Sequence, residues 1–259
     1  MYSGSADFMS RGSHFLCFEA ETFWRDIISM EKLIVRFLEF GSDKYAYMKH
    51  LPANSRVLDV GCGDCRRLRY RSYHRNDLIQ HGIDVQEDRG CKKHLATFHA
   101  LDIAKETLPF EEEYFDLVVM SHVLEHLPRS DFLFCLREIK RVLRGGGYFY
   151  IEFPSEKTSR FVTAKTLKRY ALPVTTLNFY DDDTHVSLYS VQEVIGILEG
   201  ESLKVYRYGD VREPVKKCLA PLLIVAGCIL RNESVVTGAL WSLVNWASFI
   251  VAKKEGSRS

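Results

Sequence analysis

Two glycines separated by one residue follow an apolar run that contains an acid, in the segment Val57-Leu58-Asp59-Val60-Gly61-Cys62-Gly63. This pattern predicts a buried strand that ends in a tight turn, where a ligand can approach the backbone closely. A dinucleotide-binding loop would carry a third glycine at position 66, which is Arg66 here. Asp59 would also repel a pyrophosphate, so the loop favours a cationic or polyhydroxyl ligand.

Polar side chains also follow the later apolar runs. Asp84 and Asp102 each end a short apolar run, and Ser121 and His122 follow a longer one over residues 115–120. Ligands of open parallel sheets bind outside the carboxyl ends of the strands, and an acid after the second strand hydrogen-bonds ribose hydroxyls. The spacing therefore predicts a ligand with a ribose at this edge of a sheet.

The glycine loop resembles the first motif of the class I S-adenosylmethionine-dependent methyltransferases, which reads (D/E)xGxGxG. Asp59, Gly61 and Gly63 match this motif, whereas Cys65 replaces its last glycine.

Two further segments strengthen the resemblance. Residues 115–127, FDLVVMSHVLEHL, resemble the family's FDxVxxxxxxEHL segment. The helix expected over 136–143 runs through Arg144 and three glycines into an apolar run, which resembles the family's LkPGG step with arginine in place of proline. The resemblance is strong over about residues 50–155 and weak elsewhere.

The resemblance implies S-adenosylmethionine as the cofactor and S-adenosylhomocysteine as its product. Asp59 would hold the loop and reach the methionine amino group, Asp84 would bind the ribose, and Asp102 would contact the adenine. The full set of expected cofactor residues is Asp59, Gly61, Cys62, Gly63, Asp84, Val85, Asp102, Ile103, Ser121 and His122.

Two histidines are candidate general bases, because imidazole titrates near neutral pH. His126 belongs to the EHL segment, in which a structural role at a helix start is expected for Glu125. His185 follows three aspartates in a loop that would close over the acceptor, and it is favoured because such loops carry acceptor chemistry. Its alternative is a solvated histidine whose pKa the neighbouring acids raise.

The seven cysteines form no regular framework, which indicates reduced thiols and a cytoplasmic protein. Cys62 and Cys65 form a CxxC pair, but no second pair or histidine pair accompanies it, so no metal site is expected. No signal peptide is expected at the N-terminus.

Apolar runs alternate with helical patterns and predict an α/β fold, with parallel strands joined by right-handed crossovers. The resemblance makes this a Rossmann-like, doubly wound, seven-stranded and mostly parallel sheet with an antiparallel last strand. The expected strands cover residues 56–60, 79–84, 97–101, 115–121, 147–153, 203–208 and 249–253.

The chain is expected to contain a flexible tail over 1–18 and a single domain over 19–259. Within this domain we expect three parts, and the last of them contains an apolar insertion over 212–246. These parts are a helical cap (19–51), a cofactor-binding core (52–155) and an acceptor-side region (156–259).

The insertion contains two apolar runs, of which Cys218–Leu230 is shorter than the ~20 residues that span a bilayer. The sequence does not decide between four interpretations of residues 218–246. These are helices packed on the sheet, a homodimer interface, a lid over an apolar acceptor, and peripheral membrane contact. Trp241 and Trp246 are expected on different parts of one helix surface.

Basic and acidic residues nearly balance, 35 against 34, which removes the electrostatic argument for a nucleic-acid partner. The expected function is methyl transfer to an oxygen or nitrogen of a small molecule, such as a sugar, polyketide, phenol or lipid-linked metabolite. Two alternatives stay open. One is an RNA or protein methyltransferase, and the other is a catalytically silent binding subunit, since Cys65 and Arg144 depart from the family pattern.

Overall fold

The computed structural model of this protein describes residues 30–86 and 95–256. The tail expected over 1–18 and the first part of the helical cap lie outside these residues. Seven strands form one sheet in the order β3-β2-β1-β4-β5-β7-β6. The strands are β1 (Arg56–Val60), β2 (Ile79–Asp84), β3 (Thr97–Ala100), β4 (Phe115–Ser121), β5 (Leu143–Pro154), β6 (Leu203–Asp210) and β7 (Ala247–Lys254).

Strand pairing confirms the predicted fold class. β1 pairs in parallel with β2 and β4, and the parallel pairing continues from β2 to β3 and from β4 to β5. β7 runs antiparallel to both β5 and β6. The parallel strands therefore end at a common edge, where the predicted polar residues lie.

The strand after the three glycines is longer than the sequence predicts. β5 starts at Leu143 rather than at 147, because Gly146 adopts a φ of +77° and the pairing with β4 shifts register there. Arg144, the residue in place of the family's proline, pairs with Asp116 (Nη1 to Oδ1, 2.5 Å). A proline at this position could not form that ion pair.

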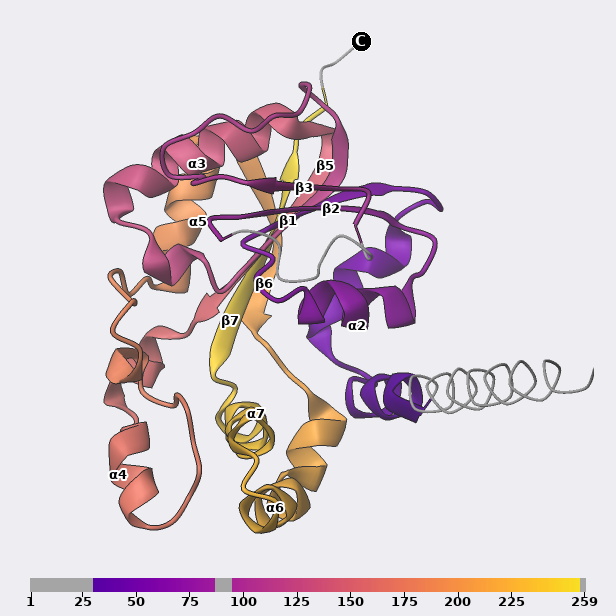
Figure 1. The fold of residues 1–259 in the computed structure, drawn as a ribbon. Helices are drawn as coiled ribbons and strands as arrows, with labels where there is room; N and C mark the ends of the chain where they lie inside the picture. The colour runs from indigo at the N-terminus through magenta and orange to yellow at the C-terminus, as the bar shows by residue number, and fades with distance from the viewer. Residues whose placement is uncertain (1–29, 87–94, 257–259) are drawn as a thin grey trace, which may run out of the picture.

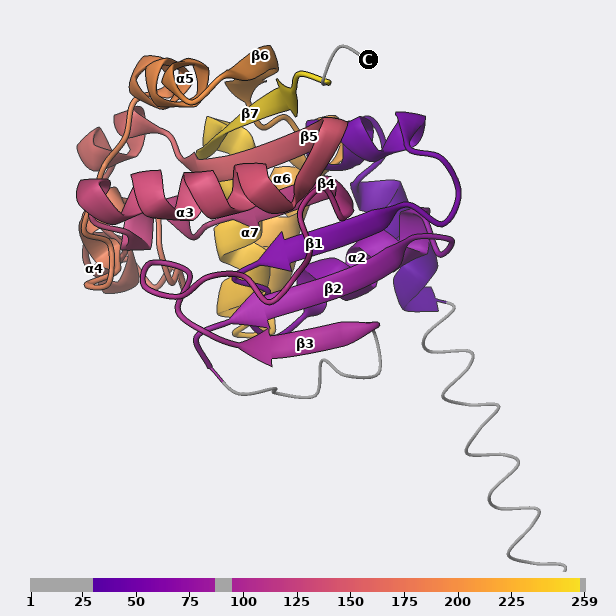
Figure 2. The same ribbon diagram turned by 90° about the horizontal axis from the view of Figure 1, so that it is seen from above.

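Helices cover both faces of the sheet (Figure 1, Figure 2). α3 and α5 lie on one face, and α2, α6 and α7 lie on the other. The helices are α2 (Arg66–His74), α3 (Arg129–Val142), α4 (Ala164–Arg169), α5 (Val191–Gly200), α6 (Pro214–Ile229) and α7 (Glu233–Val244). Short 3₁₀ turns are η1 (Asp43–His50), η3 (Leu124–His126), η4 (Glu156–Arg160) and η5 (Phe179–Asp181).

Each face has its own apolar core. Alternate residues of β4 divide between them: Val118 packs with α3 and α5, while Val119 packs with η1, α4 and α7. Because both faces are covered, all seven residues of β4 are buried. This explains why the strand reads as a continuous apolar run.

The apolar insertion forms two helices, α6 and α7. Gly227 lets α6 approach α7 closely, since a Cβ there would lie 2.6 Å from Val236 Cγ2. α7 buries Val236 in the core on its face of the sheet, whereas α6 leaves Leu222, Val225 and Ile229 exposed. Among the described residues, no helix is both long and apolar enough to cross a membrane.

The two tryptophans differ from the prediction. α7 ends at Val244, and Asn245 takes a left-handed conformation (φ 48°) that turns the chain back. Trp246 therefore stacks on Trp241, with ring centroids 4.1 Å apart and planes 6° apart. The expectation of two separate surfaces on one helix is wrong, because the helix does not reach Trp246.

Candidate active site

The turn after β1 requires glycine at its first position. Gly61 has a φ of +68°, and a Cβ there would lie 2.2 Å from Val123 Cγ2. Val123 follows β4, so the loop after β1 packs directly on the segment after β4. A side chain at position 61 would push these two loops apart.

The second glycine connects the loop to the end of β2. The backbone N–H of Gly63 donates to Asp84 Oδ2 (2.7 Å), and the N–H of Gln86 donates to Asp84 Oδ1 (3.0 Å). The Asp84 carboxylate thus fixes both the tip of the glycine loop and the turn that follows β2. It stays accessible, because Asp84 also lines the cavity described next.

A cavity of about 720 Å³ opens at the carboxyl ends of the parallel strands. Of the ten expected cofactor residues, those that line it are Gly61, Gly63, Asp84, Val85, Asp102, Ile103 and His122. It is also lined by His126, one of the two candidate bases. The volume falls within the ~300–1,000 Å³ range of small-molecule sites.

Asp59 does not line this cavity. Its side chain is buried and accepts a hydrogen bond from Arg71 (Nη2 to Oδ2, 3.0 Å), which also donates to Gln80 Oε1 (3.1 Å). The acid of the first motif therefore binds α2 to β1 and β2 behind the glycine loop. A direct contact with a bound methionine amino group stays a proposal.

Cys62 and Ser121 also lie behind the cavity. Cys62 is buried under the glycine loop, and this burial raises the pKa of its thiol. Ser121 ends β4 and its hydroxyl accepts a hydrogen bond from Arg67. Both side chains support the loops that line the cavity.

Cys65 stands where the family pattern has its last glycine. It adopts the left-handed conformation (φ 56°) at the start of α2, which glycine adopts at the least cost. Cys65 is disulfide-bonded, so the expectation of reduced thiols is wrong for this residue. Four other described cysteines are free: Cys62, Cys135, Cys218 and Cys228.

Asp102 lies on the cavity wall after β3. Its carboxylate accepts hydrogen bonds from Lys105 Nζ (2.6 Å) and from the N–H of Ala104 (3.0 Å). The Lys105 hydrogen bond holds the pKa of Asp102 below its ordinary value. The acid is therefore ionised at neutral pH and remains a hydrogen-bond acceptor.

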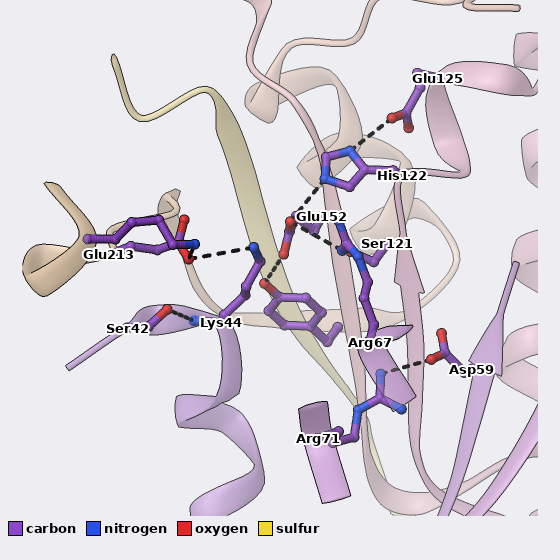
Figure 3. Close-up of polar contacts among 12 residues, drawn as sticks. Ser42, Lys44, Asp59, Arg67, Arg71, Ser121, His122, Glu125, Glu152 and Glu213 are labelled. Carbon is purple, nitrogen blue, oxygen red and sulfur yellow. Dashed lines mark hydrogen bonds and ion pairs between the residues drawn. The ribbon is translucent and has the colours of Figure 1, made fainter. Parts of the chain in front are cut away.

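His122 joins the cavity to a buried charge network (Figure 3). Its Nδ1 lies 3.0 Å from Glu125 Oε1 and its Nε2 lies 3.1 Å from Glu152 Oε1. Burial and Arg67 lower the pKa of His122, but the two carboxylates outweigh them and raise it above its usual value. An imidazolium that donates from both nitrogens fits this position. His122 is therefore a poor general base, because both of its nitrogens already carry a hydrogen.

Glu152 is the fully buried centre of this network. It accepts a hydrogen bond from the Tyr150 hydroxyl (2.7 Å) and pairs with Arg67 (3.4 Å). Burial raises the pKa of its carboxyl, but Lys44 and Arg67 outweigh burial and hold it well below the ordinary range. The network was not expected from the sequence, because its members come from η1, α2, β4 and β5.

The two candidate bases lie side by side. The rings of His126 and His185 have centroids 5.0 Å apart. Only 4% of the His185 side chain is exposed. His126 Nδ1 is 3.1 Å from Thr184 O, and His185 Nδ1 is 2.6 Å from Phe179 O. The structure thus brings together two histidines from distant segments, and of the two only His126 lines the cavity.

Further lining residues were missed from the sequence. The segment after β4 contributes an apolar wall through Val123, Leu127 and Pro128, and Thr184 reaches the cavity from the loop before α5. The first three directly follow the predicted strand end, which is a usable signal. Thr184 carries no local signal of this kind.

Comparison with known proteins agrees with this geometry. Residues 58–151 match the family model described as a methyltransferase domain. The phthiotriol/phenolphthiotriol dimycocerosates methyltransferase of Mycobacterium tuberculosis (strain ATCC 25618 / H37Rv) is 39% identical over 106 residues, which cover 36% of this chain and 35% of that protein.

A second relative is the 27-O-demethylrifamycin SV methyltransferase of Amycolatopsis mediterranei (strain S699), which is 33% identical over 116 residues, or 41% of each chain. The matches therefore span less than half of the length of these curated relatives. A solved S-adenosylmethionine-dependent methyltransferase from Archaeoglobus fulgidus superposes with a TM-score of 0.53 at 21% identity, covering 88% of this chain and 94% of that one.

The glycine loop, the acids after β2 and β3, and the seven-stranded sheet with one antiparallel strand define a class of proteins. The match identifies residues 58–151 as a methyltransferase domain, and the sheet has the fold of the class I S-adenosylmethionine-dependent methyltransferases. S-adenosylmethionine is the cofactor of this class.

Proposed function

We propose that this protein transfers a methyl group from S-adenosylmethionine to an oxygen or nitrogen of a small-molecule acceptor with a large apolar part. The observation that carries this proposal is the cavity at the carboxyl edge of the sheet. Gly61 and Gly63 line it, with open space beside Gly63, and Asp84 and Asp102 offer carboxylates after β2 and β3.

The residues present fit the cofactor. Asp84 presents a carboxylate to the ribose hydroxyls, and Asp102 lies on the wall next to Ile103, where the adenine is proposed to bind. S-adenosylmethionine supplies an activated methyl group on a sulfonium. The protein therefore mainly has to align the acceptor with that methyl group and exclude water.

On the acceptor side, we place His126 in direct contact with the acceptor and His185 behind it. His126 lines the cavity, whereas His185 is nearly enclosed. His122 is assigned a different role, because the carboxylates on both sides occupy its two nitrogens. It stabilises the wall between the cavity and the buried network.

The names of the relatives support an oxygen acceptor. Phthiotriol and 27-O-demethylrifamycin SV are named for hydroxyl groups or for an O-methyl position. A nucleic-acid or protein acceptor is the second candidate within the class, and the near balance of charge disfavours nucleic acid. The third candidate function is that of a catalytically silent binding subunit.

The decisive experiment uses S-adenosylmethionine with a tritium-labelled methyl group. The full chain is incubated with separate panels of phenols, quinols and long-chain alcohols, and with total RNA and a protein extract as competitors. Label in the organic-extractable fraction supports the proposal. Label only in RNA or protein favours the second candidate, and cofactor binding without any transfer favours a silent subunit.

We also propose that the exposed face of α6 contacts a lipid surface. Leu222, Val225 and Ile229 recur at helical spacing on this face, and Lys217 at the start of α6 is an exposed basic residue. Such a face suits a monotopic contact, in which apolar residues enter the lipid and basic residues meet its headgroups. A peripheral contact would give the enzyme access to an acceptor with a long apolar part.

A further inference from the structure

We propose that Glu125, His126 and His185 form a binding site for a divalent transition-metal ion at the acceptor end of the cavity. One potential ligand atom from each residue lies within 4.8 Å of those of the other two. The residues come from η3, which follows β4, and from the loop after η5, so only the folded chain brings them together.

Among the described residues, the hydrogen bonds of both imidazoles are made by Nδ1, and the nearest acid to Nε2 of His185 is Asp182, at 3.8 Å. Phe179 O accepts from His185 Nδ1 (2.6 Å), and Thr184 O accepts from His126 Nδ1 (3.1 Å). The Thr184 hydroxyl donates to Asp182 and so can also accept from His126 Nδ1 (3.0 Å). A carbonyl oxygen only accepts, so each Nδ1 carries a hydrogen, and in the neutral ring Nε2 then has a lone pair for a metal ion. Histidines that bind metals typically donate their other ring N–H to a carbonyl or carboxylate in this way.

Glu125 supplies an oxygen that lacks a partner among the described residues. Its Oε1 accepts from His122 Nδ1, but its Oε2 is buried without a hydrogen-bond partner, in a residue that is only 1% exposed. An unpaired buried carboxylate oxygen is costly. A bound cation would satisfy it.

A second carboxylate adds to the negative charge. Asp182 Oδ2 lies 3.8 Å from His185 Nε2, and Asp182 Oδ1 accepts from the Thr184 N–H (2.9 Å) and hydroxyl. Two carboxylates and two neutral imidazoles would balance the charge of one divalent cation. His122, the neighbouring cationic group, also pairs with Glu152, which is a carboxylate outside the proposed metal site.

The ligand types select the ion. Two imidazoles and one or two carboxylates suit Zn²⁺, Fe²⁺, Mn²⁺ or Co²⁺ better than Ca²⁺ or Mg²⁺, which prefer oxygen ligands alone. This set was not expected from the sequence, whose only considered metal motif was the CxxC pair.

The site would act on the acceptor, and this consequence rests on the proposed function. His126 and Thr184 line the cavity, so an acceptor hydroxyl could reach the ion. Coordination lowers the pKa of a bound hydroxyl, which would release its proton to water at the cavity opening. The alkoxide oxygen would then form a bond to the methyl carbon as the carbon–sulfur bond breaks, and S-adenosylhomocysteine would leave with the electron pair on sulfur. The ion would then replace free imidazole as the activating group and would favour oxygen over nitrogen acceptors.

The test measures metal binding without any acceptor. The untagged full chain is stripped with a chelator and titrated with Co²⁺ by visible absorption, and then with Zn²⁺ by calorimetry. We expect one ion per chain, with a Co²⁺ spectrum typical of nitrogen and oxygen ligands. His185→Gln and His126→Gln should each weaken binding by at least ~10-fold, and Glu125→Gln should do the same. His50→Gln, at an exposed histidine outside the cluster, should leave it unchanged.

Several results would overturn the proposal. These are the absence of a Co²⁺ spectrum, or equal affinities in the wild type, the His50 control and the cluster variants. S-adenosylhomocysteine binding and circular dichroism are measured for every variant, so that misfolding is recognised. His126→Gln is the substitution expected to disturb the fold least, because His126 lines the cavity. A chain that binds S-adenosylhomocysteine but no metal contradicts this inference alone. A chain that binds metal but no S-adenosylhomocysteine contradicts the proposed function instead.

Discussion

Asp59 and Asp84 lie near the carboxyl ends of the neighbouring parallel strands β1 and β2, and yet the structure gives the two acids different surroundings. Asp84 faces the cavity and holds the Gly63 N–H, while Asp59 is buried against Arg71. The difference follows from position along the strands, because Asp59 pairs with Gly82, two residues before Asp84. The two acids therefore point to the same face of the sheet, but only Asp84 reaches its carboxyl edge. Direct cofactor binding is therefore proposed for Asp84.

Asp84→Ala should weaken S-adenosylhomocysteine binding by about 1.5–3 kcal/mol, because the ribose hydroxyls lose a charged acceptor. Calorimetry with the full chain measures this loss. Asp183→Ala removes an exposed acid outside the cavity lining and should bind like the wild type. Equal affinities of Asp84→Ala and the wild type would show that the ribose lies elsewhere.

At the scale of elements, α2 is held to the sheet by a buried ion pair. Arg71 is 1% exposed and Asp59 is 3% exposed, so both charges are removed from water. Arg66 and Asp64, at the start of the same helix, form an exposed pair (3.1 Å). A comparison of these two pairs shows how burial changes the contribution of an ion pair to stability.

Arg71→Met should lower the free energy of unfolding by about 3–5 kcal/mol, because it leaves the Asp59 carboxylate buried and unpaired. The double variant with Asp59→Asn should lose less than the sum of the two single losses. Arg66→Met, which removes the exposed pair, should change stability by only ~0–1 kcal/mol. Urea denaturation gives all four values, and strictly additive losses would contradict coupling between Asp59 and Arg71.

The exposed face of α6 is the second feature at this scale. We expect the full chain to float with anionic vesicles, and the Leu222→Glu/Ile229→Glu double variant to remain unbound. Both side chains are exposed, so these substitutions should leave the fold intact. Val162→Glu, at an exposed apolar residue outside α6, is the control and should still float. No flotation together with a stable dimer in solution scattering would identify the face as a subunit interface.

At the scale of the whole molecule, Glu152 connects segments that are far apart in the chain. Lys44 from η1, Arg67 from α2, and His122 after β4 surround it, and Tyr150 donates to it from its own strand. Lys44 also lies 3.8 Å from Glu213, the residue before α6. The network thus joins the N-terminal helical turn, the core and the insertion (Figure 3).

The lowered pKa of Glu152 predicts how stability depends on pH. A carboxyl whose pKa is lower in the folded state stabilises the fold above its unfolded pKa of about 4.5 and loses this contribution as pH falls towards the folded value. Glu152→Gln should therefore destabilise the protein at neutral pH and make its unfolding free energy less dependent on pH below 4.5.

Urea denaturation at neutral and acidic pH tests this prediction. Glu111→Gln, which changes an exposed acid, should follow the pH dependence of the wild type. If Glu152→Gln shows the same acid dependence as the wild type, the carboxylate does not provide this stabilisation.

The sequence alone determined the sheet, the glycine loop and the edge at which the cavity opens. Strand periodicity and turn glycines are local, and parallel strands bring their carboxyl ends to one edge. Gly61, Gly63, Asp84 and Asp102 therefore line the cavity, as their position after the strands predicts.

Only the tertiary structure decided which side chains act together. Asp59 turns towards Arg71, His122 lies between Glu125 and Glu152, and His185 meets His126. Trp246 folds back on Trp241 because the helix ends before it. These contacts depend on side-chain direction and on packing between distant segments, neither of which is encoded in local spacing.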